Sequence, residues 1–202
     1  MMMQMLKAPL IAMATLIASP ALATAAIGQP APAFTATDSN GHAVNLSDFR
    51  GKTVVLEWTN AECPFVQKHY NSDNMQNLQS AAKAKNIVWL TINSGAAGKQ
   101  GHVDGAGANS IMKRTGAAPT AYLLDTDGKI GKAYGARTTP HMYVIDGKGV
   151  LAYMGGIDDI PSADPADIGK ARNFISLALA DLEAGKPVAN PTSRAYGCSV
   201  KY

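Results

Sequence analysis

The chain has 202 residues, of which 47% are apolar and 16% are charged, which suits one packed domain and excludes an intrinsically disordered protein. Its formal net charge of +3, without any run of Lys and Arg, excludes a nucleic-acid binder that needs a concentrated basic face. Two cysteines are too few for a disulfide-dense miniature scaffold or for a zinc site built of cysteines alone.

The first segment, residues 1–23, is mostly apolar, and Lys7 is its only charged side chain. The apolar run over residues 10–18 has the length of a signal-peptide core and is too short to span a bilayer. Cleavage is expected after Ala23, with Ala25 as a close alternative, and a buried N-terminal helix is the competing interpretation. We therefore predict a signal peptide over 1–23 and an exported, periplasmic protein, in which a disulfide can persist. No later stretch is apolar enough over a sufficient length to predict a membrane span.

After this segment the chain alternates strand and helix patterns. Strands are predicted over residues 53–58, 87–92, 120–124, 141–145 and 150–154, after an N-terminal hairpin that turns at residues 38–41. Helices are predicted over residues 64–82, 108–115 and 166–184, with a glycine-rich loop over 94–107. The order indicates an α/β domain over 24–185 with a central mixed β-sheet flanked by helices, followed by an aperiodic tail over 186–202.

Cys63 has the most informative surroundings in the sequence. It follows the buried strand 53–58 and stands directly before Pro64, and proline is favoured at the first position of a helix. Cys63 is therefore expected at a helix N-terminus, open to solvent, where the helix dipole stabilises a thiolate. Glu62 works against that ionisation if its carboxylate faces the sulfur, whereas Lys68 and His69 either offset it or are ordinary solvated residues.

Several segments together resemble the redoxin branch of the thioredoxin-like superfamily, which includes the AhpC/TSA antioxidant proteins and the periplasmic thiol-disulfide oxidoreductases. The resemblance rests on Pro32-Ala33-Phe34, Phe49-Arg50-Gly51-Lys52, Cys63-Pro64 and Thr138-Thr139-Pro140 before the strand at 141–145. It implies a thioredoxin-like fold with Cys63 as nucleophile. It also implies a cis Thr139–Pro140 peptide bond beside the sulfur, where Thr139, Pro140 and Pro64 would meet a bound substrate chain.

The sequence departs from the family patterns in three respects. Thioredoxin-type enzymes carry Cys-x-x-Cys, but Val66 stands where the second cysteine would be. Peroxiredoxins carry Pro-x-x-x-Thr-x-x-Cys, but Leu56 and Asn60 occupy the proline and threonine positions, and Thr59 comes one place too early. The peroxiredoxin arginine before the late strand is also displaced, since Pro140 holds its place and Arg137 comes three residues earlier.

Cys198, in the C-terminal tail, is the remaining thiol that could resolve a mixed disulfide or a sulfenic acid on Cys63. A static bridge that pins the tail to the domain and a bridge between two chains are the other interpretations. The sequence leaves these three pairings, and the oligomeric state, open.

We predict an exported thiol-disulfide oxidoreductase with Cys63 and Cys198 as catalytic residues, acting on protein thiols and disulfides and recycled by an unidentified reductant. The first alternative is a peroxidase that consumes hydroperoxides. The second is a non-catalytic binding or copper-carrying module, with His69, His102 and His141 as candidate nitrogen ligands beside Cys63. For the main hypothesis we expect no cofactor, no metal and no nucleic-acid partner. The glycine-rich loop is also not a phosphate-binding loop, because it lacks the required spacing.

Overall fold

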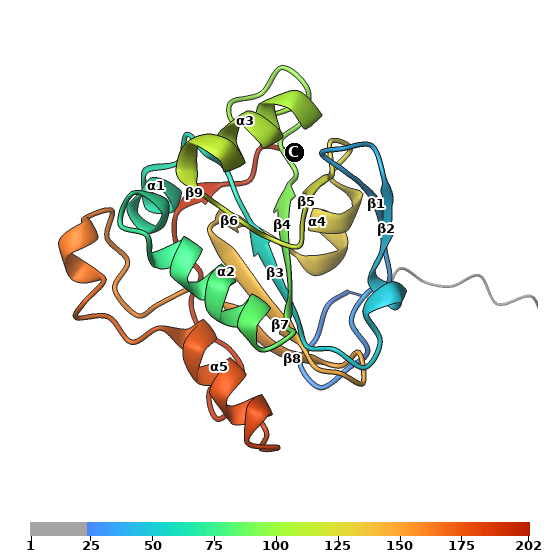
Figure 1. Cartoon of the computed structure of the whole chain (residues 1–202), viewed down its shortest axis with the longest axis vertical. Helices are drawn as coiled ribbons and strands as arrows, with labels where there is room; N and C mark the ends of the chain where they lie inside the picture. The colour runs from blue at the N-terminus through green and yellow to red at the C-terminus, as the bar shows by residue number, and fades with distance from the viewer. Residues whose placement is uncertain (1–23) are drawn as a thin grey trace, which may run out of the picture.

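A seven-stranded mixed sheet forms the centre of the structure, a computed structural model that describes residues 24–202 (Figure 1). The predicted signal peptide, residues 1–23, lies outside the described residues. The strands are β1 (Thr35–Asp38), β2 (Ala43–Asn45), β3 (Val54–Trp58), β4 (Val88–Asn93), β5 (Ala121–Leu124), β6 (Thr138–Thr139), β7 (His141–Ile145), β8 (Leu151–Gly155) and β9 (Cys198–Ser199). The helices are α1 (Pro64–Asn71), α2 (Asn74–Ala84), α3 (Gly105–Thr115), α4 (Lys129–Tyr134) and α5 (Phe174–Glu183), with 3₁₀ turns at Leu46–Phe49 and Pro165–Asp167.

The order of strands in the main sheet is β2-β1-β5-β4-β3-β7-β8. The central pairs β3–β4 and β4–β5 are parallel, and the outer pairs are antiparallel. All five residues of β3 and all six of β4 are buried, which explains why both strands consist mainly of apolar and β-branched residues. The predicted α/β class and mixed sheet are therefore confirmed.

The two faces of the sheet are covered by different elements. On one face Val54, Leu56 and Trp58 of β3 pack with Ile130 and Tyr134 of α4 and with the N-terminal hairpin. On the other face the buried apolar residues come from the sheet, from the segment after β8, from α2, from α5 and from the tail; they are Val55, Met75, Ala82, Trp89, Met142, Val144, Tyr153, Ile157, Ile175, Ala178 and Tyr196. The C-terminal tail thus contributes to the second core through Tyr196.

Three predicted elements have different bounds in the structure. The helix expected over 64–82 is two helices, because the chain breaks at Ser72 and Asp73, and Asp73 takes a left-handed φ of 59°. The helix expected over 166–184 begins only at Phe174, where the Asn173 side chain accepts a hydrogen bond from Ser176 N–H as an N-cap. The loop expected over 94–107 ends earlier, since α3 begins at Gly105.

The tail is ordered by pairing, which its sequence did not indicate. Its strand β9 pairs antiparallel with β6, so that Thr139 lies opposite Cys198 and Thr138 lies opposite Ser199. In Figure 1 this short pair lies beside the start of α1. The tail therefore lies against the domain at the point where Cys63 lies.

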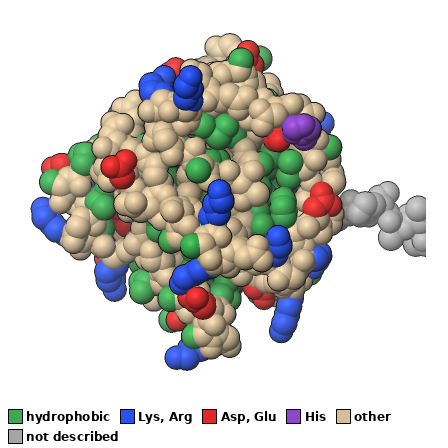
Figure 2. All heavy atoms as spheres, in the orientation of Figure 1, with side chains coloured by type: hydrophobic (Ala, Val, Ile, Leu, Met, Phe, Trp, Pro, Cys, Tyr) green, Lys and Arg blue, Asp and Glu red, His purple; other side chains and the backbone are tan. Residues whose placement is uncertain are grey.

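Two surface properties bear on partners. On the face drawn in Figure 2, Lys and Arg side chains are spread among Asp and Glu rather than gathered in one patch. Within residues 24–202, every helix is either too short or too polar to cross a membrane.

Candidate active site

Cys63 lies at the carboxyl end of β3, on a tight turn that leads into α1. The Asn60 side chain accepts a hydrogen bond from Glu62 N–H at 2.9 Å, and the Asn60 carbonyl accepts one from Cys63 N–H at 3.0 Å. Cys63 is the N-cap residue of α1, and Pro64 fills the first helical position, where its missing N–H costs nothing. The predicted placement of Cys63 at a helix N-terminus is confirmed.

The two cysteines, 135 positions apart in the chain, meet at this helix start. The Sγ of Cys63 lies 2.6 Å from the Sγ of Cys198 and 3.1 Å from the carbonyl oxygen of Thr139, and both cysteines are free thiols. The Thr139–Pro140 peptide bond is cis, as the resemblance implies. The structure thus brings Cys63, Cys198 and the Thr139–Pro140 pair together, whereas the side chain of Pro64 is exposed at the helix start.

The expectation that Cys63 is open to solvent is wrong. Its exposed fraction is 0%, while Cys198 is half-buried. The physical reason is the tail, since β9 lies on β6 and places Cys198 directly on the sulfur of Cys63. Cys63 therefore combines a helix N-terminus with burial, and a partner that reaches it must displace the tail.

The surroundings of the two thiols shift their pKa values in opposite directions. Burial pushes the pKa of Cys63 upward, but hydrogen bonds from the Cys198 thiol and from the Val66 backbone outweigh it and hold the pKa below its ordinary value. Burial, followed by the hydrogen bond to Cys63, raises the pKa of Cys198 to about 11. Cys63 is thus the sulfur that ionises first, and Cys198 keeps its proton. Glu62 is exposed and is absent from the leading contributions to this shift.

A buried carboxylate, which the sequence reasoning did not single out, joins α1 to the sheet. Glu57 of β3 accepts hydrogen bonds from Tyr70 of α1 at 2.7 Å, from Trp89 at 2.8 Å and from Thr91 at 3.0 Å. Burial raises the pKa of Glu57, and these donors lower it in part. The network fixes the helix that carries Cys63 relative to β3 and β4. The signal available in the sequence was an acidic residue inside an otherwise apolar strand.

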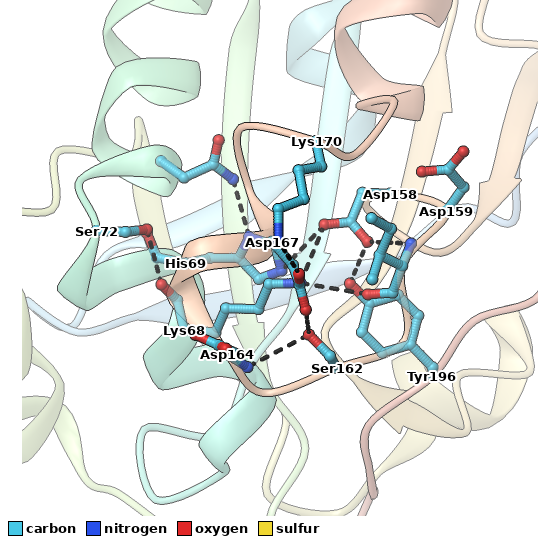
Figure 3. Close-up of polar contacts among 12 residues, drawn as sticks. Lys68, His69, Ser72, Asp158, Asp159, Ser162, Asp164, Asp167, Lys170 and Tyr196 are labelled. Atoms are coloured by element: carbon cyan, nitrogen blue, oxygen red, sulfur yellow. Dashed lines mark hydrogen bonds and ion pairs between the residues drawn. The ribbon is translucent and has the colours of Figure 1, made fainter.

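The opposite side of α1 holds a second buried polar group. Lys68 and His69, interpreted from the sequence as offsetting Glu62 or as ordinary solvated residues, are both buried, with Asp158 beside them (Figure 3). Burial lowers the pKa of His69 to about 4, so the ring is neutral at pH 7. Their solvated interpretation is therefore wrong, because the loop after β8 and the tail cover this side of the helix.

Asn60, which occupies the position of the peroxiredoxin threonine, and the displaced residues Thr59 and Arg137 have other surroundings in this structure. The Asn60 amide donates to Gln100 at 3.1 Å, and Arg137 is exposed. Thr59 is buried and lines a cavity of about 240 Å³ between α1 and α3, together with Val66 and Met112. Neither cysteine lines this cavity.

The histidines considered as copper ligands do not gather around Cys63. The ring of His102 lies 2.9 Å from the Gly95 carbonyl, and that of His141 lies 3.2 Å from the Tyr143 hydroxyl. In the part of the chain that the structure describes, no three His, Cys, Asp or Glu side chains are placed to hold a metal ion. The three histidines therefore do not form a shared ligand set with Cys63 in these residues.

The chain is similar to a protein family and to individual proteins that are already known. The Redoxin family model matches residues 26–171. The thiol-disulfide oxidoreductase ResA of Bacillus thuringiensis subsp. konkukian is 29% identical over 123 residues, which cover 61% of this chain and 65% of ResA. The chain thus spans somewhat less than two thirds of the length of this relative.

Solved structures support the fold. An uncharacterized conserved protein from Geobacillus kaustophilus matches with a TM-score of 0.75 and 28% identity, covering 88% of this chain and 92% of that one. The thioredoxin domain of a thiol-disulfide oxidoreductase from Bacteroides vulgatus matches with a TM-score of 0.53 and 19% identity, covering 73% of this chain and 97% of that domain. The predicted thioredoxin-like fold is confirmed.

Proposed function

Because this chain belongs to the Redoxin family, and because its two thiols meet at a helix N-terminus, we propose that it is a thiol-disulfide oxidoreductase with Cys63 as nucleophile and Cys198 as resolving cysteine. The observation that carries the proposal is the 2.6 Å contact between two sulfurs whose pKa values are shifted in opposite directions. The ResA relative is a thiol-disulfide oxidoreductase by name, which supports the same reaction class.

The reaction proceeds in two exchange steps. With the tail displaced, the Cys63 thiolate attacks a disulfide of a partner protein, which forms a mixed disulfide and releases one partner thiolate. Cys198 then attacks the Cys63 sulfur, so that the Cys63–Cys198 disulfide forms and the second partner thiol leaves. Two electrons pass from the cysteine pair to the partner, and the proton of Cys198 passes to a released partner thiolate. An external dithiol returns the pair to its reduced form.

Thr139 and Pro140 are proposed to position the partner chain. In the structure the backbone of Thr139 pairs with the chain's own tail at Cys198, and its carbonyl oxygen lies 3.1 Å from the Cys63 sulfur. A partner strand that takes the place of β9 would meet the same backbone edge. Pro64, at the first position of α1, borders the approach to the sulfur.

We also propose export to the periplasm, with residues 1–23 as a signal peptide, residues 24–185 as the redoxin domain and residues 186–202 as the tail that carries Cys198. The support is the apolar run over residues 10–18 with small residues before Thr24. An oxidising compartment also suits a cysteine pair that works by forming a disulfide. Protein mass measured in a periplasmic fraction should correspond to a chain that begins at Thr24. A full-length chain that stays in the cytoplasm would contradict this part of the proposal.

Matched cysteine variants test the mechanism. With a protein disulfide as substrate and dithiothreitol as reductant, Cys63→Ser should reduce turnover to the buffer rate. In a separate reaction without dithiothreitol, the reduced Cys198→Ser variant should retain the first attack and accumulate a mixed disulfide on Cys63, visible by mass under non-reducing conditions. Full disulfide reduction by Cys63→Ser would contradict the mechanism. Consumption of hydroperoxide by the wild-type protein, with no reduction of disulfides, would favour the peroxidase instead.

A further inference from the structure

The residue two places before Cys198 is buried against the helix that carries Cys63. Tyr196 has an exposed fraction of 8%, and its ring packs edge-on against Phe65 of α1 with the centroids 5.8 Å apart. The Lys68 Nζ atom lies 5.8 Å from the centre of the same ring. The tail is therefore attached to α1 through an aromatic side chain as well as through the sulfur contact.

The hydroxyl of Tyr196 lies within a buried group of polar side chains (Figure 3). This group, here named the Asp158 cluster, consists of Lys68, His69, Asp158 and Tyr196. Tyr196 donates a short hydrogen bond to Oδ1 of Asp158. The other carboxylate oxygen, Oδ2, lies 3.5 Å from Lys68 Nζ and 3.9 Å from His69 Nε2. Asp158 is 3% exposed, and Lys68 also donates to the Ile160 carbonyl at 3.2 Å. A hydroxyl bonded to a buried carboxylate makes a stronger contact than a neutral hydrogen bond.

The cluster joins the same two segments that carry the two sulfurs. Lys68 and His69 stand on α1, whose N-cap is Cys63, and Tyr196 stands in the tail two residues before Cys198. Gly197, which separates Tyr196 from Cys198, has a φ of +128°, and a Cβ at this position would collide with the Thr139 carbonyl oxygen. The short connection between Tyr196 and Cys198 therefore runs tightly against the β6 backbone. Where Tyr196 is held, Cys198 is held as well.

We propose that Tyr196 is a positioning residue for Cys198. The hydrogen bond from Tyr196 to Asp158 holds the tail so that Cys198 lies against Cys63. This inference rests on the function proposed above, since it assigns the residue that aligns the resolving thiol. The docked tail has two opposite effects. It raises the local concentration of Cys198 at the Cys63 sulfur, and it covers Cys63 against reagents from outside.

Tyr196→Phe tests the proposal because it removes the hydroxyl and keeps the ring. Tyr134→Phe is the matched control, since it deletes a buried tyrosine hydroxyl that donates to the Pro32 carbonyl at 2.8 Å on the other face of the sheet. The first measurement is the equilibrium of the full-length protein with glutathione, in which two protein thiols and oxidised glutathione give the Cys63–Cys198 disulfide and two reduced glutathione molecules. The second is the rate at which iodoacetamide alkylates Cys63 in the reduced protein.

In Tyr196→Phe the equilibrium constant for the internal disulfide should fall roughly tenfold or more, and alkylation of Cys63 should become faster by a similar factor. Tyr134→Phe should lower the melting temperature while it leaves both quantities near the wild-type values. If wild type forms the disulfide and Tyr196→Phe matches it, or if both variants shift both quantities equally, Tyr196 is only structural and the inference is wrong. If wild type forms no Cys63–Cys198 disulfide at all, the proposed function fails together with the inference.

Discussion

The two cysteines of this protein lie in regions that are held in different ways. Cys63 lies at the junction of β3 and α1, where a fully buried strand and the hydrogen bonds to Glu57 fix the helix on the sheet. Cys198 lies in the tail, which the domain holds through a pair of two-residue strands, through isolated backbone hydrogen bonds at residues 191–193 and 200–201, and through single side chains. Among these, the hydroxyl of Tyr202 donates to the Ala136 carbonyl at 2.7 Å.

This difference agrees with the roles proposed above for the two thiols. The sulfur in the core region has the lowered pKa, and the sulfur in the tail has the raised one. A nucleophile benefits from a fixed position, whereas a resolving thiol must move away to admit a partner and return afterwards. Around Cys198 the tail is held by the β6–β9 pair, which has only two residues in each strand, so local release there does not require the rest of the tail to leave the domain.

Removing Asp158 should affect both regions and should give the largest effect on stability. Asp158→Ala leaves the buried Lys68 ammonium without its carboxylate, and breaking a buried ion pair in this way costs about 3–5 kcal/mol of unfolding free energy. The adjacent Asp159→Ala is the control, because it breaks a largely exposed pair with Arg172 and should cost about 1 kcal/mol or less. Urea denaturation of both variants measures the contrast, and equal losses would show that the Asp158 cluster is not a buried anchor.

Substituting Gly197 should affect the tail region alone. Gly197→Ala combines a φ of +128° with a collision between the new Cβ and the Thr139 carbonyl oxygen, so β9 must leave β6. Backbone strain of this kind costs about 1–3 kcal/mol, which corresponds to roughly tenfold faster alkylation of Cys63. Gly185→Ala has a φ of +69° but meets no atom within 4 Å, and it should leave the alkylation rate unchanged. An unchanged rate in Gly197→Ala would mean that the tail does not control access to Cys63.

Titration of the two thiols should give the smallest but most specific difference. Cys63 should ionise below the ordinary range of cysteine and Cys198 near pH 11, so the reactive thiolate forms at Cys63 as the pH rises and Cys198 follows last. In Cys198→Ala the pKa of Cys63 should rise, because the thiol that hydrogen-bonds its sulfur is gone. The NMR chemical shifts of the cysteine Cβ atoms measure each ionisation separately. If Cys198 ionised before Cys63, the assigned roles would be reversed.

Local signals in the sequence were sufficient for the frame of the site. The β-branched run before Cys63 predicted a buried strand, and Pro64 predicted the helix start, because both depend on residues that are neighbours in the chain. The resemblance to redoxins supplied the cis bond before Pro140. The fold class and the location of Cys63 could therefore be predicted without coordinates.

The missed features depend on contacts between distant segments. Lys68 and His69 carry polar groups on a helix and resemble solvated residues, but distant segments at Asp158 and Tyr196 help to bury them. The burial of Cys63 depends likewise on a tail that shows no periodicity and is held by short backbone pairings and by single side chains. Such contacts leave no pattern along the sequence. The interpretation of Cys198 as the resolving thiol for Cys63 was therefore one of three alternatives that the sequence left open.

The central claim is that Cys63 and Cys198 of one chain form a reversible disulfide. The most direct test is the mass of the proteolysed, non-reduced protein, measured before and after treatment with a disulfide oxidant at low protein concentration. The claim predicts that oxidation links the peptides of Cys63 and Cys198 within a monomer and that dithiothreitol separates them again. Two thiols that stay unlinked under oxidation, or a link found only between two chains, would contradict it.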